Sequence, residues 1–196
     1  MEKSIIDLML NGEKYEMRRI CFTGHRDIKP EDITYVKSCL RLLIRKEIRN
    51  GVTNFMTGLA KGVDTYAAQI VYDEKKNFPH IVLEGAAPYR GRLNSKDSET
   101  RAIIGACDEI FVVSEKYAKG CFQKRNEFMV DNSDKVIAVF DKRKKGGTRN
   151  TINYAEKSGK DIFVLDLDFK DKDKEAAFVY NIEKALELDN KKNEQN

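Results

Sequence analysis

The sequence has few of the residues from which metal centres and disulfide frameworks are built. It contains two histidines and four cysteines, and no two of the cysteines form a Cys-x-x-Cys pair. A zinc site needs clustered cysteine and histidine ligands, and a disulfide framework needs closely spaced cysteines. We therefore expect no metal site and reduced thiols, as in proteins of a reducing compartment.

Long apolar runs and a strong excess of one charge are also missing. No apolar run reaches the roughly 20 residues needed to span a bilayer. Glu2 and Asp7 interrupt the apolar patch at the N-terminus, so we expect neither a membrane segment nor a secretory signal. The chain has 36 lysines and arginines and 32 aspartates and glutamates, and this small excess of positive charge does not by itself indicate binding to nucleic acid. These features predict a cytoplasmic protein.

With 196 residues, of which 41% are hydrophobic and 35% charged, the chain is long enough for one large domain with extensions. We expect an N-terminal extension at 1–18, a main domain at 19–168 and a C-terminal segment at 169–196. Asn11-Gly12 suits either a hairpin or the end of a short helix in the extension. The last segment is expected to hold a helix at about 175–188 and then a disordered charged tail.

Apolar runs typical of buried strands alternate with helical patterns through the main domain. The runs are continuous, which indicates a parallel sheet covered on both faces. We therefore predict an α/β, doubly wound, mainly parallel sheet of about six strands with helices on both faces. The strands are expected at 19–24, 54–56, 80–84, 109–114, 136–140 and 161–165, and the helices at 31–50, up to about 77, 95–107, around 125–129 and from 146–148 to 158.

Turns that carry glycine or arginine follow four of these strands, and ligands of such sheets bind outside the carboxyl ends of the strands. After the second strand, Gly58 allows a sharp turn and Gly62 allows a ligand to approach the backbone. Asp64 suits either the helix dipole or a ribose hydroxyl. Arg26 and Arg125 are expected to bind the anionic part of the ligand.

Several of these segments resemble the SLOG superfamily, a Rossmann-like group that includes DprA, the LOG phosphoribohydrolases and YpsA-like proteins. Residues 57–64 (TGLAKGVD) are similar to the glycine turn of DprA and YpsA-like proteins. Residues 107–114, 125–134 (RNEFMVDNSD) and 137–141 followed by 146–148 look YpsA-like in particular. The resemblance covers about residues 19–165.

The resemblance implies a pocket for a nucleotide or a nucleotide-derived ligand, such as an ADP-ribose-like compound. Together with the turns, it gives these candidate ligand-binding residues: Gly24, His25, Arg26, Gly58, Gly62, Asp64, Ser114, Arg125, Asn126, Gly146, Gly147 and Thr148. The role of His25 stays open between a ligand contact, a general acid or base, and neither.

One departure from the superfamily bears on catalysis. LOG enzymes carry a glutamate after a Gly-Thr pair, and the residues that follow Gly147-Thr148 include Asn150 in its place and no carboxylate. An anionic carboxylate stabilises the cationic sugar that forms when a glycosidic bond breaks. Whether the chain is an enzyme, and which residues would be catalytic, therefore stays open, and no cofactor is assigned.

Three functions compete at this point. We favour a sensor or regulatory protein that binds a nucleotide-derived small molecule. A LOG-type nucleoside 5'-monophosphate phosphoribohydrolase and a DprA-like protein that binds single-stranded DNA are the alternatives. DNA binding would need a basic groove with stacking aromatics, so nucleic acid is the less favoured partner. The superfamily also suggests a homodimer or a larger homo-oligomer.

Overall fold

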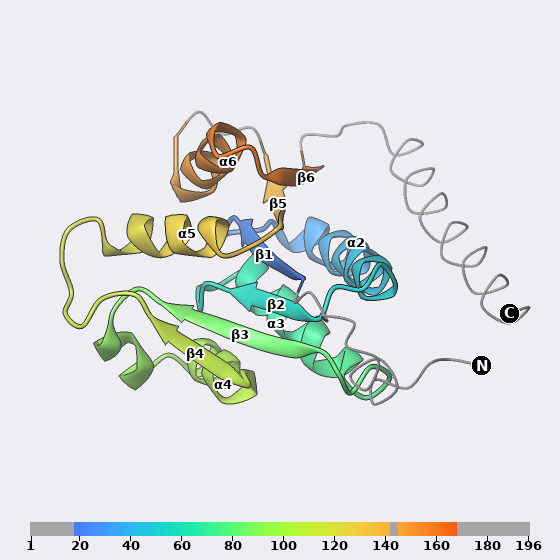
Figure 1. The fold of residues 1–196 in the computed structure, drawn as a ribbon, viewed down its shortest axis with the longest axis horizontal. Helices are drawn as coiled ribbons and strands as arrows, with labels where there is room; N and C mark the ends of the chain where they lie inside the picture. The colour runs from blue at the N-terminus through green and yellow to red at the C-terminus, as the bar shows by residue number, and fades with distance from the viewer. Residues whose placement is uncertain (1–17, 142–144, 168–196) are drawn as a thin grey trace, which may run out of the picture.

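In the computed structural model, which describes residues 18–141 and 145–167, six strands form one parallel sheet with helices on both faces (Figure 1). The strands are β1 (Arg19–Gly24), β2 (Asn54–Thr57), β3 (Val82–Ala87), β4 (Glu109–Val112), β5 (Lys135–Phe140) and β6 (Asp161–Asp166). The helices are α2 (Pro30–Arg49), α3 (Val63–Glu74), α4 (Ser98–Ala106), α5 (Cys121–Asp131) and α6 (Gly147–Lys157), with a short 3-10 helix, η1 (Arg90–Asn94). The predicted α/β, Rossmann-like fold is confirmed.

The order of the strands reverses at the centre of the sheet. From β1 the chain adds β2, β3 and β4 on one side, and it then crosses back to place β5 and β6 on the other side, which gives the order β4-β3-β2-β1-β5-β6. The loops that follow β1 and β5 leave this point in opposite directions. A crevice is therefore expected between the carboxyl ends of β1 and β5.

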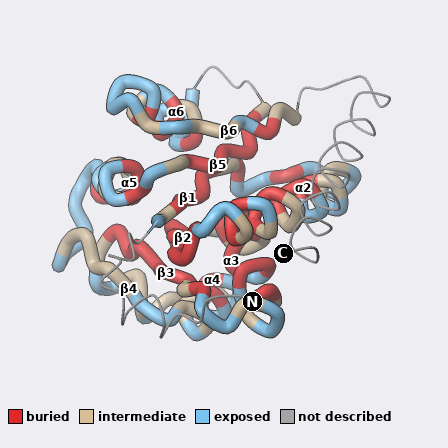
Figure 2. The backbone as a smooth tube through the Cα atoms, turned by 45° about the vertical axis from the view of Figure 1, so that its right-hand side comes forward, coloured by how far each residue is buried: buried red, intermediate tan, exposed pale blue. Residues whose placement is uncertain are grey.

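Successive side chains of each strand enter two separate cores. In β1, Ile20 and Phe22 belong to the core that includes residues of α2 and α3, whereas Cys21 packs with Met129 of α5 and Ala155 of α6. The packing of α2 against α3, of α3 against α4, and of α5 against α6 agrees with this division. The strands β1, β2, β3 and β5 are consequently buried along most of their length, whereas the edge strands β4 and β6 are only partly buried (Figure 2). Burial on both faces explains the continuous apolar runs of the central strands.

Helix α2 begins and ends where the sequence predicts. Pro30 occupies its first turn, where a missing N–H costs nothing, and Gly51 follows its end with a φ of +85°. Acidic residues lie in its first turn and basic residues in its last turn, so both complement the helix dipole. Its apolar stripe lies in the core beside α3.

The third strand differs from its prediction, since it spans Val82–Ala87 rather than 80–84. Gly85 and the two alanines after it suggested a turn, but they continue the strand in a crowded place. A Cβ at Gly85 would lie 3.0 Å from Leu59 Cδ2 and 3.1 Å from Cys107 Sγ. Small residues are present here because neighbouring side chains fill the space, which a local pattern does not reveal.

Some predictions concern residues beyond those described or properties of the whole chain. The hairpin or helix expected at 1–18 and the helix expected at about 175–188 lie outside the described residues. All four cysteines are described and are free thiols. Among the helices at 18–141 and 145–167, none is both long and apolar enough to cross a membrane.

Candidate anion-binding site

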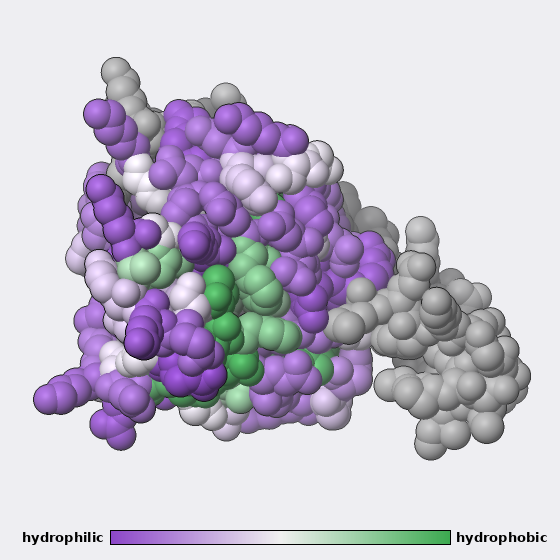
Figure 3. All heavy atoms as spheres, turned by 60° about the vertical axis from the view of Figure 1, so that its left-hand side comes forward, coloured by the Kyte–Doolittle hydropathy of each residue, from purple (hydrophilic) through white to green (hydrophobic). Residues whose placement is uncertain are grey.

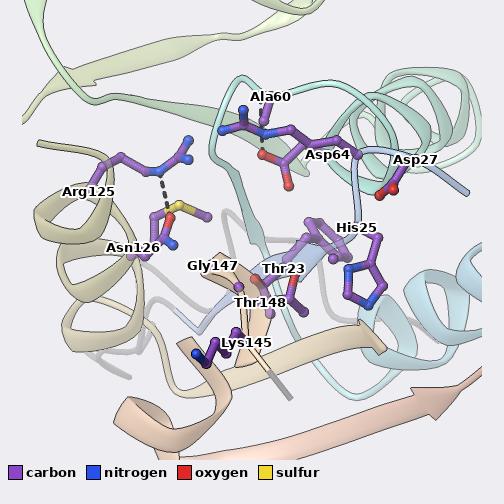
Figure 4. A pocket seen from close by; sticks show the side chains of 15 residues that line it. Thr23, His25, Asp27, Ala60, Asp64, Arg125, Asn126, Lys145, Gly147 and Thr148 are labelled. Carbon is purple, nitrogen blue, oxygen red and sulfur yellow. Dashed lines mark hydrogen bonds between the residues drawn. The ribbon is translucent and has the colours of Figure 1, made fainter. Parts of the chain in front are cut away.

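A cavity of about 380 Å³ lies at the carboxyl edge of the sheet, where β1 and β5 meet (Figure 4). Segments from four parts of the chain line it: residues 22–27 of β1 and its loop, the turn after β2 with the start of α3, residues 125–129 of α5, and residues 145–148 at the start of α6. The expected site residues that line the cavity are Gly24, His25, Arg26, Asp64, Arg125, Asn126, Gly146, Gly147 and Thr148. The crevice of the doubly wound sheet therefore brings most of them together.

Arg125 is the cation most deeply placed in this cavity. Its side chain is 4% exposed, and its Nε donates to the Oδ1 of Asn126 at 2.8 Å. Its Nη1 is buried and has no hydrogen-bond partner among the described residues. Burial lowers the pKa of Arg125, against the negative charge of Asp64, which raises it. A buried charged donor without a partner is costly, so its persistence favours a ligand that completes it.

Asp64 lies across the cavity from α5, in the first turn of α3 (Figure 4). Its Oδ2 accepts the backbone N–H of Ala60 at 3.1 Å, so the carboxylate holds the turn after β2 in shape. Burial raises the pKa of Asp64, against the charge of Arg125 and the Ala60 N–H, which lower it. Asp64 therefore accepts a hydrogen bond from the protein's own backbone. The sequence alone suggested two other roles for it, which were interaction with the helix dipole and a bond to a ribose hydroxyl.

Gly58 and Gly62 shape the site without lining the cavity. A Cβ at Gly58 would lie 2.1 Å from Arg125 Nη1, so the missing side chain leaves the room that the guanidinium occupies. At Gly62, which has a φ of +76°, a Cβ would lie 2.3 Å from the carbonyl oxygen of His25. The backbone of His25 and Arg26 therefore approaches Gly62 closely on the side where a Cβ would stand, and a ligand contact at Gly62 stays a prediction.

The N-terminus of α6 opens onto the cavity. Gly146 precedes the helix, no side chain in the described part of the chain caps it, and both Gly146 and Gly147 line the cavity. The first N–H groups of a helix have no partner within the helix and carry partial positive charge. Thr148 is 6% exposed and Lys145 lines the same wall, so this end of the cavity combines backbone donors with a lysine.

His25 is held by neighbours rather than presented freely to the cavity. Its Nε2 lies 2.8 Å from the Oδ1 of Asp141, and its ring stacks on Phe140 with 5.5 Å between the ring centroids. The side chain is buried, although the residue lines the cavity. These contacts orient the loop after β1 against the end of β5.

Ser114, by contrast, does not line the cavity. It follows β4, the edge strand, which is separated from β1 by β2 and β3. Its carbonyl accepts the N–H of Arg90, which joins the loops after β3 and β4. The lining residues that sequence reasoning did not single out are Phe22, Thr23, Asp27, Ala60, Met129 and Lys145. Ala60 and Met129 lie inside the segments 57–64 and 125–134 that resemble the superfamily, and Lys145 directly precedes residues 146–148.

The donor set indicates what this cavity can bind. Buried guanidinium, open helix N–H groups and a lysine are partners for an anion, phosphate above all. Among the residues that the structure describes, no group of three or more His, Cys, Asp or Glu side chains is placed to hold a metal ion. Asn150 is exposed and lies outside the lining, whose carboxylates are Asp27 and Asp64.

One protein-family model, several bacterial proteins and a solved structure are similar to this chain. The family model YpsA, described as the YspA SLOG family, matches residues 19–172. The SPbeta prophage-derived protein YoqJ of Bacillus subtilis (strain 168) is 35% identical over 133 residues, which cover 59% of this chain and 77% of YoqJ. The UPF0398 protein BH1768 of Halalkalibacterium halodurans is 28% identical over 156 residues, 76% of this chain and 80% of that protein. The X-ray structure of TM1055 superposes with a TM-score of 0.49 at 18% identity, over 74% of this chain and 72% of that chain.

Proposed function

Because the chain belongs to the YspA SLOG family, we propose that it binds a nucleotide or a nucleotide-derived small molecule in the cavity between β1 and β5, as a sensor or regulatory protein. The observation that carries this proposal is the buried Nη1 of Arg125, which has no partner among the described residues and belongs to a cavity-lining side chain. We assign the phosphate of the ligand to the guanidinium of Arg125, since guanidinium groups bind such oxyanions through charge-assisted hydrogen bonds.

The surrounding residues support the same position for the phosphate. The start of α6 adds backbone N–H groups at Gly147 and Thr148, and Lys145 and Arg26 add charge at the rim. Asp64 repels an anion and accepts hydrogen bonds, so it suits a hydroxyl of the sugar. We therefore place the phosphate of the ligand on the side of α5 and α6, where the positive charges lie, and the sugar on the side of Asp64, whose carboxylate accepts hydrogen bonds.

A thermal-shift screen tests this proposal with inorganic phosphate, ribose 5-phosphate, AMP and ADP-ribose as probes. Ligands stabilise the state that binds them, and a probe at 100 times its Kd contributes about 2.7 kcal/mol, or a rise in Tm of roughly 5–10 °C for a chain of this size. We expect AMP or ADP-ribose to raise Tm beyond a sulfate control of equal ionic strength. If none of the four probes does so, the proposed function is wrong.

The same cavity is expected to be a poor site for cleaving nucleoside monophosphates. Asn150 is exposed and is not in the lining, and the Oδ2 of Asp64 already accepts a backbone N–H. An assay of free-base release from AMP should therefore give turnover far below the roughly 10 per second of a typical enzyme. Turnover near that value would favour the phosphoribohydrolase over the binding protein.

A further inference from the structure

Three aromatic side chains form a cluster beside the cavity, outside its lining: Tyr89, Tyr117 and Phe122. The ring of Tyr89 meets Tyr117 edge-on at 5.4 Å and Phe122 edge-on at 6.4 Å between centroids. Tyr117 is 68% exposed and Phe122 is 37% exposed. Because the three residues come from the loop after β3, the loop after β4 and the first turn of α5, only the tertiary fold brings them together.

Phe122 continues the wall of the cavity outward. Phe122 lies three residues before Arg125 and four residues before Asn126 on α5. Its side chain is therefore on the same face of the helix as theirs, about one turn, or about 5.4 Å, nearer the start of the helix. Arg26, which lines the cavity, places its guanidinium 5.7 Å from the centroid of the Phe122 ring. Figure 3, which brings the carboxyl edge of the sheet forward, shows apolar surface gathered in the middle of this face within a hydrophilic rim.

We propose that this aromatic cluster is the subsite for the base of a nucleoside 5'-phosphate whose phosphate lies on Arg125 and the start of α6. The inference rests on the proposed function and adds the part of the ligand that the cavity does not hold. Phe122 and Arg125 are three residues apart on α5, so one face of this helix presents both the proposed base subsite and the proposed phosphate contact.

The chemistry of the cluster favours a flat, aromatic occupant. A nucleobase has a π-face that stacks on Phe or Tyr, whereas a bare sugar phosphate has none. Arg26 places its guanidinium 5.7 Å from the centroid of the Phe122 ring, and because arginine also stacks on aromatic faces, we expect Arg26 to stack on the bound base together with Phe122. The cluster therefore selects nucleotides over the sugar phosphates that the cationic end would accept equally well.

Calorimetric titration of AMP and ribose 5-phosphate into the Phe122→Leu variant separates the two subsites. Leucine keeps an apolar side chain and removes the π-face. We expect AMP to bind roughly 10-fold more weakly, about 1.4 kcal/mol, within the range of about 1–3 kcal/mol for stacking of one base. The affinity for ribose 5-phosphate should stay unchanged. Tyr72→Leu is the matched control, since Tyr72 is 48% exposed on α3 and does not line the cavity.

A second variant reports the stacking directly. The chain has no tryptophan, so Phe122→Trp places a single tryptophan in the cluster. Its fluorescence should be quenched by AMP and not by ribose 5-phosphate, since only AMP carries a base.

The outcomes distinguish this inference from the function on which it rests. If unmodified protein binds AMP and ribose 5-phosphate equally tightly, or if Phe122→Leu weakens both alike, the base subsite is wrong and the proposed function stands. If short single-stranded oligonucleotides bind and AMP does not, the occupant is a strand, and the inference is overturned. If ADP-ribose binds the unmodified protein and neither AMP nor ribose 5-phosphate does, the inference for a nucleoside 5'-phosphate is wrong and the proposed function stands. If none of the four probes of the thermal-shift screen binds, both proposals fail.

Discussion

Replacing Gly62 by alanine is expected to lower the free energy of unfolding by about 2–5 kcal/mol, a large part of the roughly 5–15 kcal/mol that holds a domain folded. Gly62 has a φ of +76°, which strains any residue with a side chain. The added Cβ would also lie 2.3 Å from the His25 carbonyl oxygen and 2.7 Å from the Cα of Arg26. Both are backbone atoms, so the loop after β1 has to move, and the bond from the Val63 N–H to that carbonyl is disturbed.

Urea denaturation of the Gly62→Ala variant measures this loss, with Gly159→Ala as its matched control. Gly159 has a φ of +66° and open space where a Cβ would stand, so alanine there brings backbone strain and no clash, at about 1–2 kcal/mol. We expect Gly62→Ala to cost clearly more than the control. Equal losses would show that the packing of Gly62 against the loop after β1 adds nothing to stability.

Replacing Arg125 by methionine is expected to weaken the binding of AMP and of ribose 5-phosphate by about 1.5–3 kcal/mol, or roughly 10- to 150-fold. Methionine keeps much of the apolar volume of the buried side chain and removes the guanidinium that we assign to the phosphate. The Arg101→Met variant is the control, because Arg101 is exposed on α4 and its loss changes the net charge equally. Titration calorimetry measures both, and an Arg125→Met variant that binds like Arg101→Met would place the phosphate elsewhere.

The Arg125→Met variant should also change how the free energy of unfolding depends on pH. Burial already raises the pKa of Asp64, and the charge of Arg125 is the first influence that opposes it. Without that charge, the pKa of Asp64 rises further above its value in the unfolded chain. The stability that comes with a raised carboxyl pKa is fully present below the unfolded pKa and is lost as the pH rises through the folded pKa. The deficit of Arg125→Met relative to the unmodified protein should therefore grow as the pH rises above the unfolded pKa of Asp64, and Asp64→Asn in the same background should remove this dependence.

Much of the candidate site could be predicted because parallel strands gather their carboxyl ends at one edge of a sheet. Gly24, Arg26, Arg125 and Gly147 each follow a strand or begin a helix in the local pattern, and all of them line the cavity. Ser114 fits the same pattern and does not line it, because β4 is the edge strand. Strand order depends on pairings between residues far apart in the chain, which a local pattern does not contain.

The roles of the glycines show the same limit at atomic scale. The turn after β2 was recognisable from its glycine spacing, but which atoms approach Gly58 and Gly62 was not. In the folded chain these are the guanidinium of Arg125 and the backbone of the loop after β1. A glycine pattern indicates that something comes close, and only the packing of distant segments reveals whether it is a ligand or the protein itself.

The parallel α/β architecture and the turns that carry charge follow from residue patterns alone, because burial on both faces requires continuous apolar strands and sharp turns require glycine. The SLOG relationship was likewise visible in the motifs from Thr57 onward. The tertiary structure decided which turns share the cavity, that the Nη1 of Arg125 is buried without a hydrogen-bond partner among the described residues, and that three aromatic rings meet beside the cavity. The physical reason is that burial, unpaired donors and ring contacts are properties of neighbours in space, and the neighbours of Arg125 and Phe122 come from strands and loops that the sequence keeps far apart.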